Sequence, residues 1–220
     1  MPGSITRFGN LGQVFREGES ELLNEVARVS ILYEDLRLEL GELRVINERR
    51  DAKGPMDGDD FRVAYFMRRA LVTLIEFRRV LTTLRGTEEF KRRIIFHPEV
   101  ETDELLPAEQ YFQHNGARLK ELRNEFGGHI QPAGVKFATG HVSDVTGKIT
   151  MNRHCDGWTL GLDCDFASHL VSAVITSKLQ GIDYLQELRD AFKVIADGFN
   201  QVQAATAALV YLFLWSRFGT

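Results

Sequence analysis

The chain has 220 residues, of which 44% are hydrophobic and 26% charged, a balance typical of a globular domain with a buried core. Its formal net charge of −4 excludes a polycation, so any nucleic-acid site must be a local basic patch. Two cysteines are too few for a secreted disulfide scaffold, and the N-terminal residues lack the apolar core of a signal peptide. We therefore expect a cytoplasmic protein in which residues 1–220 form a single helical domain.

Apolar residues at spacings of three and four predict two long helices in the first half of the chain, after a loose segment at residues 1–17. The first helix covers residues 20–50 and the second residues 59–84. Between them, residues 51–60 contain two glycines and a proline and therefore predict a loop.

A short helix opened by Thr87 is expected to end near Ile95, and a third long helix starts near Thr102 or Pro107. That third helix should end at Gly127-Gly128, because glycine takes the left-handed C-cap conformation without a steric penalty.

The pattern changes at about residues 133–164, where short alternating stretches are separated by Thr-Gly and Asp-Gly turns. This predicts a small antiparallel β insertion in a mainly α fold, a helical bundle. Three more helices are expected at about 165–178, 182–196 and 199–218. The last contains the apolar run Ala204–Trp215, which at twelve residues is shorter than the roughly 20 needed to span a bilayer. We therefore expect a helix buried in protein, with no membrane partner.

One segment combines residue types that suggest chemistry, at the end of the third long helix. Arg123 offers a planar fork of donors suited to a phosphate, and His129 titrates near neutral pH and can transfer protons. On an uninterrupted helix these two residues would lie on different faces. A helix break at Gly127-Gly128 would let His129 fold back toward Arg123 and Asn124.

An arginine, a polar residue and then a histidine after four to six intervening residues resembles the signature of HEPN domains, here Arg123, Asn124 and His129. The resemblance implies a helical bundle, often dimeric, that acts as a metal-independent ribonuclease in toxin–antitoxin, defence or RNA-processing systems, or as an inactive binding module. It further implies that His129 transfers protons, Arg123 stabilises the phosphate and Asn124 orients it. The alternative interpretation is a solvated helix face with a glycine C-cap, followed by a loop histidine.

A second candidate is the basic stretch at residues 62–93, which holds nine Lys or Arg against three Glu. It indicates either a surface that tracks phosphates or an ordinary solvated face whose partners lie in the acidic first helix; we favour the second interpretation.

His154, Cys155 and Cys164 match no zinc spacing, so we expect no metal site, and no glycine loop of the nucleotide-binding type indicates a cofactor. His114 is interpreted as a histidine on a helix surface.

Three functional hypotheses follow from these observations. The first is an HEPN-like homodimer that binds or cleaves RNA without metal, a possible endoribonuclease with an antitoxin protein as a partner. The second is a non-catalytic helical dimer, an interaction module that uses the apolar stripe of residues 22–43 and the C-terminal run. The third is a small-molecule-sensing module with a pocket between the bundle and the β insertion.

Overall fold

The protein is mainly helical, as predicted. The computed structural model describes residues 21–54, 56, 59–92, 105–125, 149–150, 153–154, 157–158, 163–164 and 184–218. The helices in this part of the chain are α2 (Glu21–Lys53), α3 (Asp59–Gly86), α4 (Glu88–Phe90), α5 (Leu106–Glu125) and α8 (Tyr184–Phe218). None of these helices, α8 included, combines the length and apolar character needed to cross a membrane.

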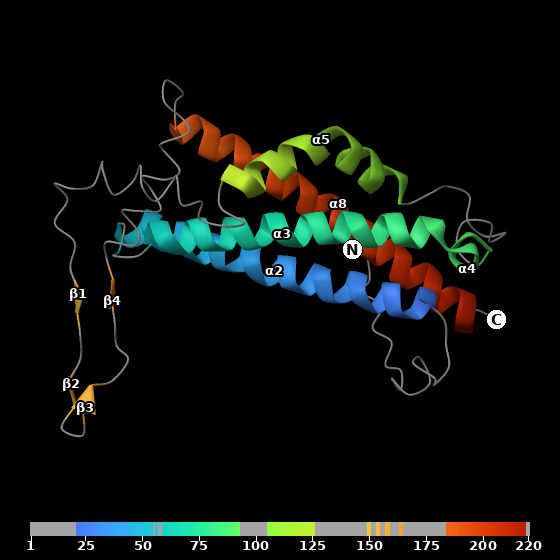
Figure 1. The fold of residues 1–220 in the computed structure, drawn as a ribbon, viewed down its shortest axis with the longest axis horizontal. Coiled ribbons are helices and arrows are strands. Elements are labelled where there is room, and N and C mark those ends of the chain that lie inside the picture. Colours follow the sequence, from blue (N-terminus) through green and yellow to red (C-terminus); the bar gives the residue numbers. More distant parts are fainter. Residues whose placement is uncertain are drawn as a thin grey trace.

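The two longest helices of the first half, α2 and α3, form an antiparallel hairpin (Figure 1). They pack through buried apolar residues that recur every seven residues on each helix, which keeps one face of each turned toward the other. On α2 these are Leu22, Val29, Leu36 and Leu43, and on α3 Met67, Leu74 and the nearly buried Leu81. The sequence predicted both helices, although the loop between them is shorter than expected, because α2 continues through Lys53.

The α2–α3 connection is fixed by the buried carboxylate of Asp59. Gly54 ends α2 with a positive φ of 79° and donates its N–H to the Arg50 carbonyl at 2.8 Å. Asp59, 2% exposed, then accepts a hydrogen bond from the Met56 N–H at 2.9 Å and pairs with Arg49 and Arg50. One carboxylate therefore ties the start of α3 to both the loop and the last turn of α2.

Helices α5 and α8 complete the bundle by packing on α3 and on each other. The rings of Phe77 on α3 and Phe112 on α5 lie 6.1 Å apart, centroid to centroid, and Tyr33 on α2 stacks on Phe199 of α8 at the same distance. The Tyr111 hydroxyl of α5 donates to the Val194 carbonyl of α8 at 2.6 Å. The buried apolar residues form one continuous core that draws on all of these helices.

The C-terminal part of the chain differs from the prediction of two helices at 182–196 and 199–218. A single helix, α8, runs from Tyr184 to Phe218 without interruption. Gly198, which stands between the two predicted helices, lies inside this single helix, where a Cβ would lie 2.8 Å from the Tyr111 hydroxyl oxygen and 3.0 Å from Leu74. The glycine therefore allows three helices to approach closely and does not end one.

The run Ala204–Trp215 forms part of α8 and faces the core on one side. Ala205, Leu209 and Phe213 are buried, whereas Tyr211 is 60% exposed. The apolar stripe of α2 expected to form a dimer interface is likewise turned inward: Leu22, Val29, Leu36 and Leu43 have no exposed surface. These four residues of α2 are therefore covered by the other helices of the bundle.

Several other predicted elements are seen in part. Helix α5 begins at Leu106, close to the predicted start, and α4 is the start of the short helix predicted after Thr87. Between residues 149 and 164 the described residues form four two-residue strands, which pair antiparallel as β1 with β4 and β2 with β3. Most of residues 133–164, the segment 1–17 and the helix predicted at 165–178 lie outside the described residues, so an extended β insertion is not established.

One buried acid lies in the α2–α3 interface. Glu39 on α2 is 6% exposed, and its Oε1 accepts from the Thr73 hydroxyl at 3.1 Å and lies 3.3 Å from Arg69 Nε. Its Oε2 is buried without a hydrogen-bond partner among the described residues. Burial therefore raises the pKa of Glu39 to about 7, with a smaller contribution from Asp35, while Thr73 and Arg69 oppose the shift.

The close approach at Gly198 can be tested by adding one methyl group. We expect Gly198→Ala to destabilise the protein by about 1–2 kcal/mol, because overpacking and the displaced Tyr111 hydroxyl outweigh the higher helix propensity of alanine. The matched control is Gly41→Ala on α2, where nothing lies within 4 Å of the added atom and stability should rise. Urea unfolding measures both variants, and equal gains at the two sites would contradict the packing role of Gly198.

The buried Glu39 predicts a pH-dependent stability. Between the unfolded pKa of 4.5 and the folded value of about 7, the folded state keeps a proton that the unfolded chain releases. The free energy of unfolding is therefore highest below pH 4.5, where Glu39 is protonated in both states. It falls as pH rises from 4.5 through about 7, by up to about 3 kcal/mol in total. Glu39→Gln should remove this loss and be the more stable protein at pH 8, whereas exposed Glu48→Gln on the same helix should follow the wild type. Parallel unfolding curves for wild type and Glu39→Gln from pH 5 to 8 would refute this role.

Candidate functional site

The last turn of α5 carries two of the three predicted site residues. Arg123 is half-buried and Asn124 exposed, and the Arg123 Nε and Nη2 donate to Asn124 Oδ1 at 3.3 and 3.1 Å. The two side chains therefore contact each other on the last turn of α5. His129 and the Gly127-Gly128 break lie outside the described residues, so the convergence of His129 with Arg123 stays a prediction.

Arg123 belongs to a line of residues along the α3-facing side of α5. Glu109, Gly116 and Arg123 are spaced seven residues apart, so they lie on one side of the helix at intervals of about 10.5 Å. Arg85 of α3 forms an ion pair with Glu109, and Arg78 of α3 lies against Gly116. The structure thus places two arginines of α3 along the line that ends at Arg123.

The Arg78 guanidinium lies against Gly116, in the space that a side chain at this position would occupy. A Cβ at this position would collide with Arg78 Nη1 and lie 3.0 Å from Arg78 Cζ. Arg78 is exposed and forms no ion pair with any residue that the structure describes. An arginine in this state keeps its full fork of donors for a ligand oxygen.

A groove of about 310 Å³ lies between α3 and α5 at this point. Its lining combines apolar side chains, neutral hydrogen-bonding groups and three charges, namely Leu81, Phe112, Thr82, Gln113, Arg78, Arg85 and Glu109. The volume lies at the lower end of the range for ligand pockets. With two arginines against one glutamate, the groove has a net positive lining and suits an anionic ligand.

Most of the other cations in the basic stretch of residues 62–93 have partners. Arg69 pairs with Glu39 of α2, Arg79 with Glu76, and Lys91 with Glu88. Arg68 lies 5.6 Å from the Tyr65 ring centroid, where a cation is attracted to the π face. The stretch is therefore largely a solvated face, and Arg69 shows that a partner can come from the acidic first helix.

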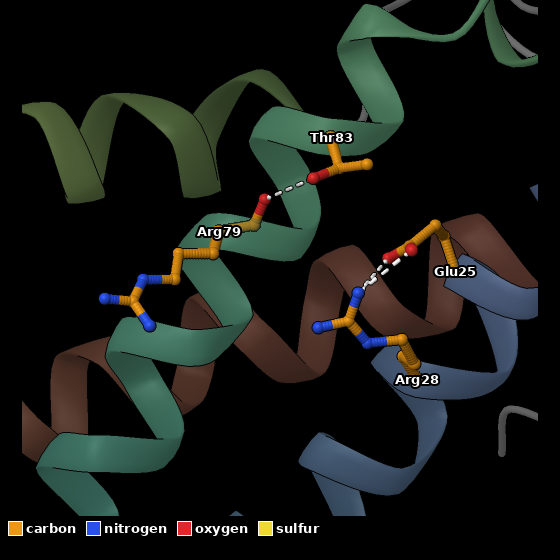
Figure 2. A network of polar contacts seen from close by, with 4 residues as sticks. All are labelled: Glu25, Arg28, Arg79 and Thr83. Atoms are coloured by element: carbon orange, nitrogen blue, oxygen red, sulfur yellow. Dashed lines mark hydrogen bonds and ion pairs between the residues drawn. The ribbon is translucent and has the colours of Figure 1, made fainter.

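Figure 2 shows how local the polar contacts on this side of the bundle are. Both Glu25 carboxylate oxygens accept from Arg28 within α2, at 2.9 and 3.0 Å, and the Thr83 hydroxyl donates to the Arg79 carbonyl within α3. The Arg79 guanidinium extends away from Glu25. Each of these contacts stabilises a single helix and does not join α2 to α3.

The remaining candidate residues give no chemical site in the described part of the chain. His154 lies in β2 and Cys164 in β4, while Cys155 is outside the described residues. Among residues that the structure describes, no three His, Cys, Asp or Glu side chains converge to hold a metal ion. His114 is exposed on α5, as the sequence indicated.

The sequence did not predict the contact between Arg78 and Gly116. A usable signal was present, because Arg78 and Arg85 are seven residues apart and Gly116 stands in the middle of an otherwise regular helical pattern.

Comparisons of the chain with protein-family models, curated proteins and solved structures found no match in any of the three. The resemblance to HEPN domains therefore rests on the motif alone.

Replacing each of the two groove arginines, Arg78 and Arg85, by alanine should change the free energy of unfolding by different amounts. Arg85→Ala breaks an ion pair whose side chains are 23% and 21% exposed and leaves Glu109 half-buried, so we expect a loss of about 1–2 kcal/mol. Arg78→Ala removes an exposed side chain without an ion pair among the described residues and should stay within about 0.5 kcal/mol of wild type. Urea unfolding checks both, and a large loss for Arg78→Ala would show that Arg78 is held for structure.

Proposed function

We propose that the protein binds RNA through the α3–α5 groove and cleaves it without metal at Arg123, Asn124 and His129, as an HEPN-like endoribonuclease of a toxin–antitoxin or defence system. The observation that carries the proposal is the Arg123–Asn124 pair on the last turn of α5, in line with Gly116 and the Arg78 guanidinium. A single-stranded polyanion that contacts Arg78 would extend along α5 toward Arg123. The polar lining of the groove, Thr82 and Gln113, supplies additional hydrogen-bonding groups.

The chemistry assigned to each residue follows from its donors and its pKa range. Arg123 binds the phosphate through its planar fork, which an ammonium group does not reproduce. Asn124 already contacts the guanidinium and orients it toward the phosphate. His129 transfers protons at the ribose hydroxyl or the leaving oxygen, the role of a general base and acid.

The proposal also includes a partner, a location and a fold element. We propose an antitoxin protein as the partner, the cytoplasm as the location, and a small antiparallel β insertion at about residues 133–164. A non-catalytic interaction module is the second candidate function. The observation that favours it is the row of exposed apolar side chains Ile31, Leu38 and Val45 on α2.

The catalytic part of the proposal is tested on a mixed pool of structured and single-stranded RNA with a chelator present. We expect wild-type protein to cleave, and His129→Ala to lose about 10²–10⁴-fold in rate through loss of proton transfer. Arg123→Ala should lose a similar factor, Asn124→Ala should lose less, and Arg123→Lys should not recover full activity. Gel analysis of the products at fixed times gives the rates.

Matched controls come from the same helix. His114→Ala removes an exposed histidine of α5, and Arg118→Ala removes an arginine paired with Glu121; both should cleave as wild type does. Equal cleavage by wild type and His129→Ala, or cleavage by neither, would favour the non-catalytic candidate. Activity that requires added zinc or magnesium would reject the metal-independent mechanism.

A further inference from the structure

One arginine of the α3–α5 groove is placed by packing and not by a charged partner. The Arg78 guanidinium lies against the backbone of Gly116, where a Cβ would be 3.0 Å from Arg78 Cζ and 3.4 Å from Nη2. Gly116 is buried, whereas Arg78 is exposed. Among the described residues, Arg78 forms no ion pair, and only its backbone carbonyl takes part in a side-chain hydrogen bond, from Thr82. The donors of this guanidinium therefore face the groove without an internal acceptor.

The second arginine of the groove is engaged inside the protein. Arg85 forms an ion pair with Glu109, and its Cζ lies 5.8 Å from the Phe90 ring centroid. Arg85 thus neutralises the one carboxylate of the groove lining, which would otherwise repel an anion. An anion in the groove therefore meets its excess positive charge at Arg78, which no described side chain neutralises.

The antiparallel course of α3 and α5 relates Arg78 to the last turn of α5 (Figure 1). Arg85 meets Glu109 and Arg78 meets Gly116, so a step of seven residues toward the start of α3 matches a step of seven toward the end of α5. The next step along α5 reaches Arg123, about two turns beyond Gly116. Two guanidinium groups therefore lie along one side of α5, at a separation that suits two different phosphates of one strand.

We propose that Arg78, positioned by Gly116, forms a second phosphate subsite that binds a backbone phosphate of single-stranded RNA away from the phosphate at Arg123. The inference rests on the proposed RNA binding and adds to it a binding residue and a positioning residue. The groove volume of about 310 Å³ suits one nucleotide of a single strand. Gln113, exposed and three residues before Gly116, lines the same groove, and its amide supplies another donor. A subsite of this kind positions the strand and reads no base.

The subsite is tested by fluorescence anisotropy of the full chain with a labelled strand of about ten 2′-O-methyl nucleotides, within the range of single-strand site sizes. This strand lacks the free hydroxyl that cleavage uses, so binding is measured apart from chemistry. Arg78→Ala should weaken binding about 10-fold, because it removes a charge-assisted contact. It should also lower the slope of log affinity against log salt by about 0.7, the contribution of one phosphate on a single strand.

The matched control is the next arginine on α3. Arg79 pairs with Glu76, is 65% exposed and projects about 100° away from Arg78 around the helix. Arg79→Ala removes the same charge and should keep the affinity and the salt slope of the wild type. Arg78→Gln keeps part of the side chain over Gly116 without the charge, and it should bind as weakly as Arg78→Ala. Urea unfolding of all three variants should match the wild type.

Gly116→Ala tests the positioning role. The added methyl group meets the far end of a flexible arginine and raises helix propensity, so stability should not fall. Affinity should fall by about 2- to 10-fold when Arg78 is present and stay unchanged in the Arg78→Ala background, a coupling that a double-mutant cycle measures. A Gly116→Ala variant that binds as the wild type does overturns the positioning role.

The outcomes separate this inference from the catalytic function. Binding that depends on Arg78, together with no cleavage of RNA, would keep the subsite and overturn the catalytic proposal. Cleavage by the wild type with equal affinity for wild type and Arg78→Ala would do the reverse. Equal losses for Arg78→Ala and Arg79→Ala, a loss that differs between uridine-rich and adenosine-rich strands, or a wild type that binds no strand each overturn the phosphate subsite.

Discussion

The antiparallel packing of α2 on α3 is the constraint on which the rest of the bundle depends. Both helices present fully buried apolar residues at seven-residue intervals, and each such side chain contributes roughly 1.5–3 kcal/mol when removed from water. The exposed ion pairs of these helices, such as Arg37–Glu34 and Arg44–Glu48, contribute about 0–1 kcal/mol each. Apolar packing therefore fixes the register of the hairpin, and Asp59 fixes its closed end.

Once α2 and α3 are in register, the surface of α3 determines where α5 lies. Phe77 packs against Phe112, Arg85 pairs with Glu109, and Arg78 lies against Gly116, all within about two turns of each helix. These contacts align α5 along α3 and create the groove between them. The orientation of the last turn of α5, where Arg123 and Asn124 lie, follows from the same alignment.

Sequence patterns predicted α2, α3 and α5 well, because their buried apolar residues recur at helical spacing. They failed at Gly198, because a glycine that ends a helix and a glycine that allows close packing look alike without the neighbouring helices. Gly116 was overlooked for the same reason. The sequence indicated Arg123 and Asn124, which are adjacent in the chain, but not the Arg78–Gly116 contact, which depends on how α3 and α5 are aligned.

The hydrogen bond from Tyr111 to the Val194 carbonyl has a consequence for local unfolding of the bundle. Burial, with a contribution from Asp197, raises the pKa of Tyr111 above its usual range, so the hydroxyl remains a donor at every physiological pH. In an α-helix the Val194 carbonyl also accepts the Gly198 N–H, so one oxygen of α8 serves both its own helix and α5. Amide hydrogen exchange should therefore report the first turns of α5 and the part of α8 around Val194 opening as one cooperative unit.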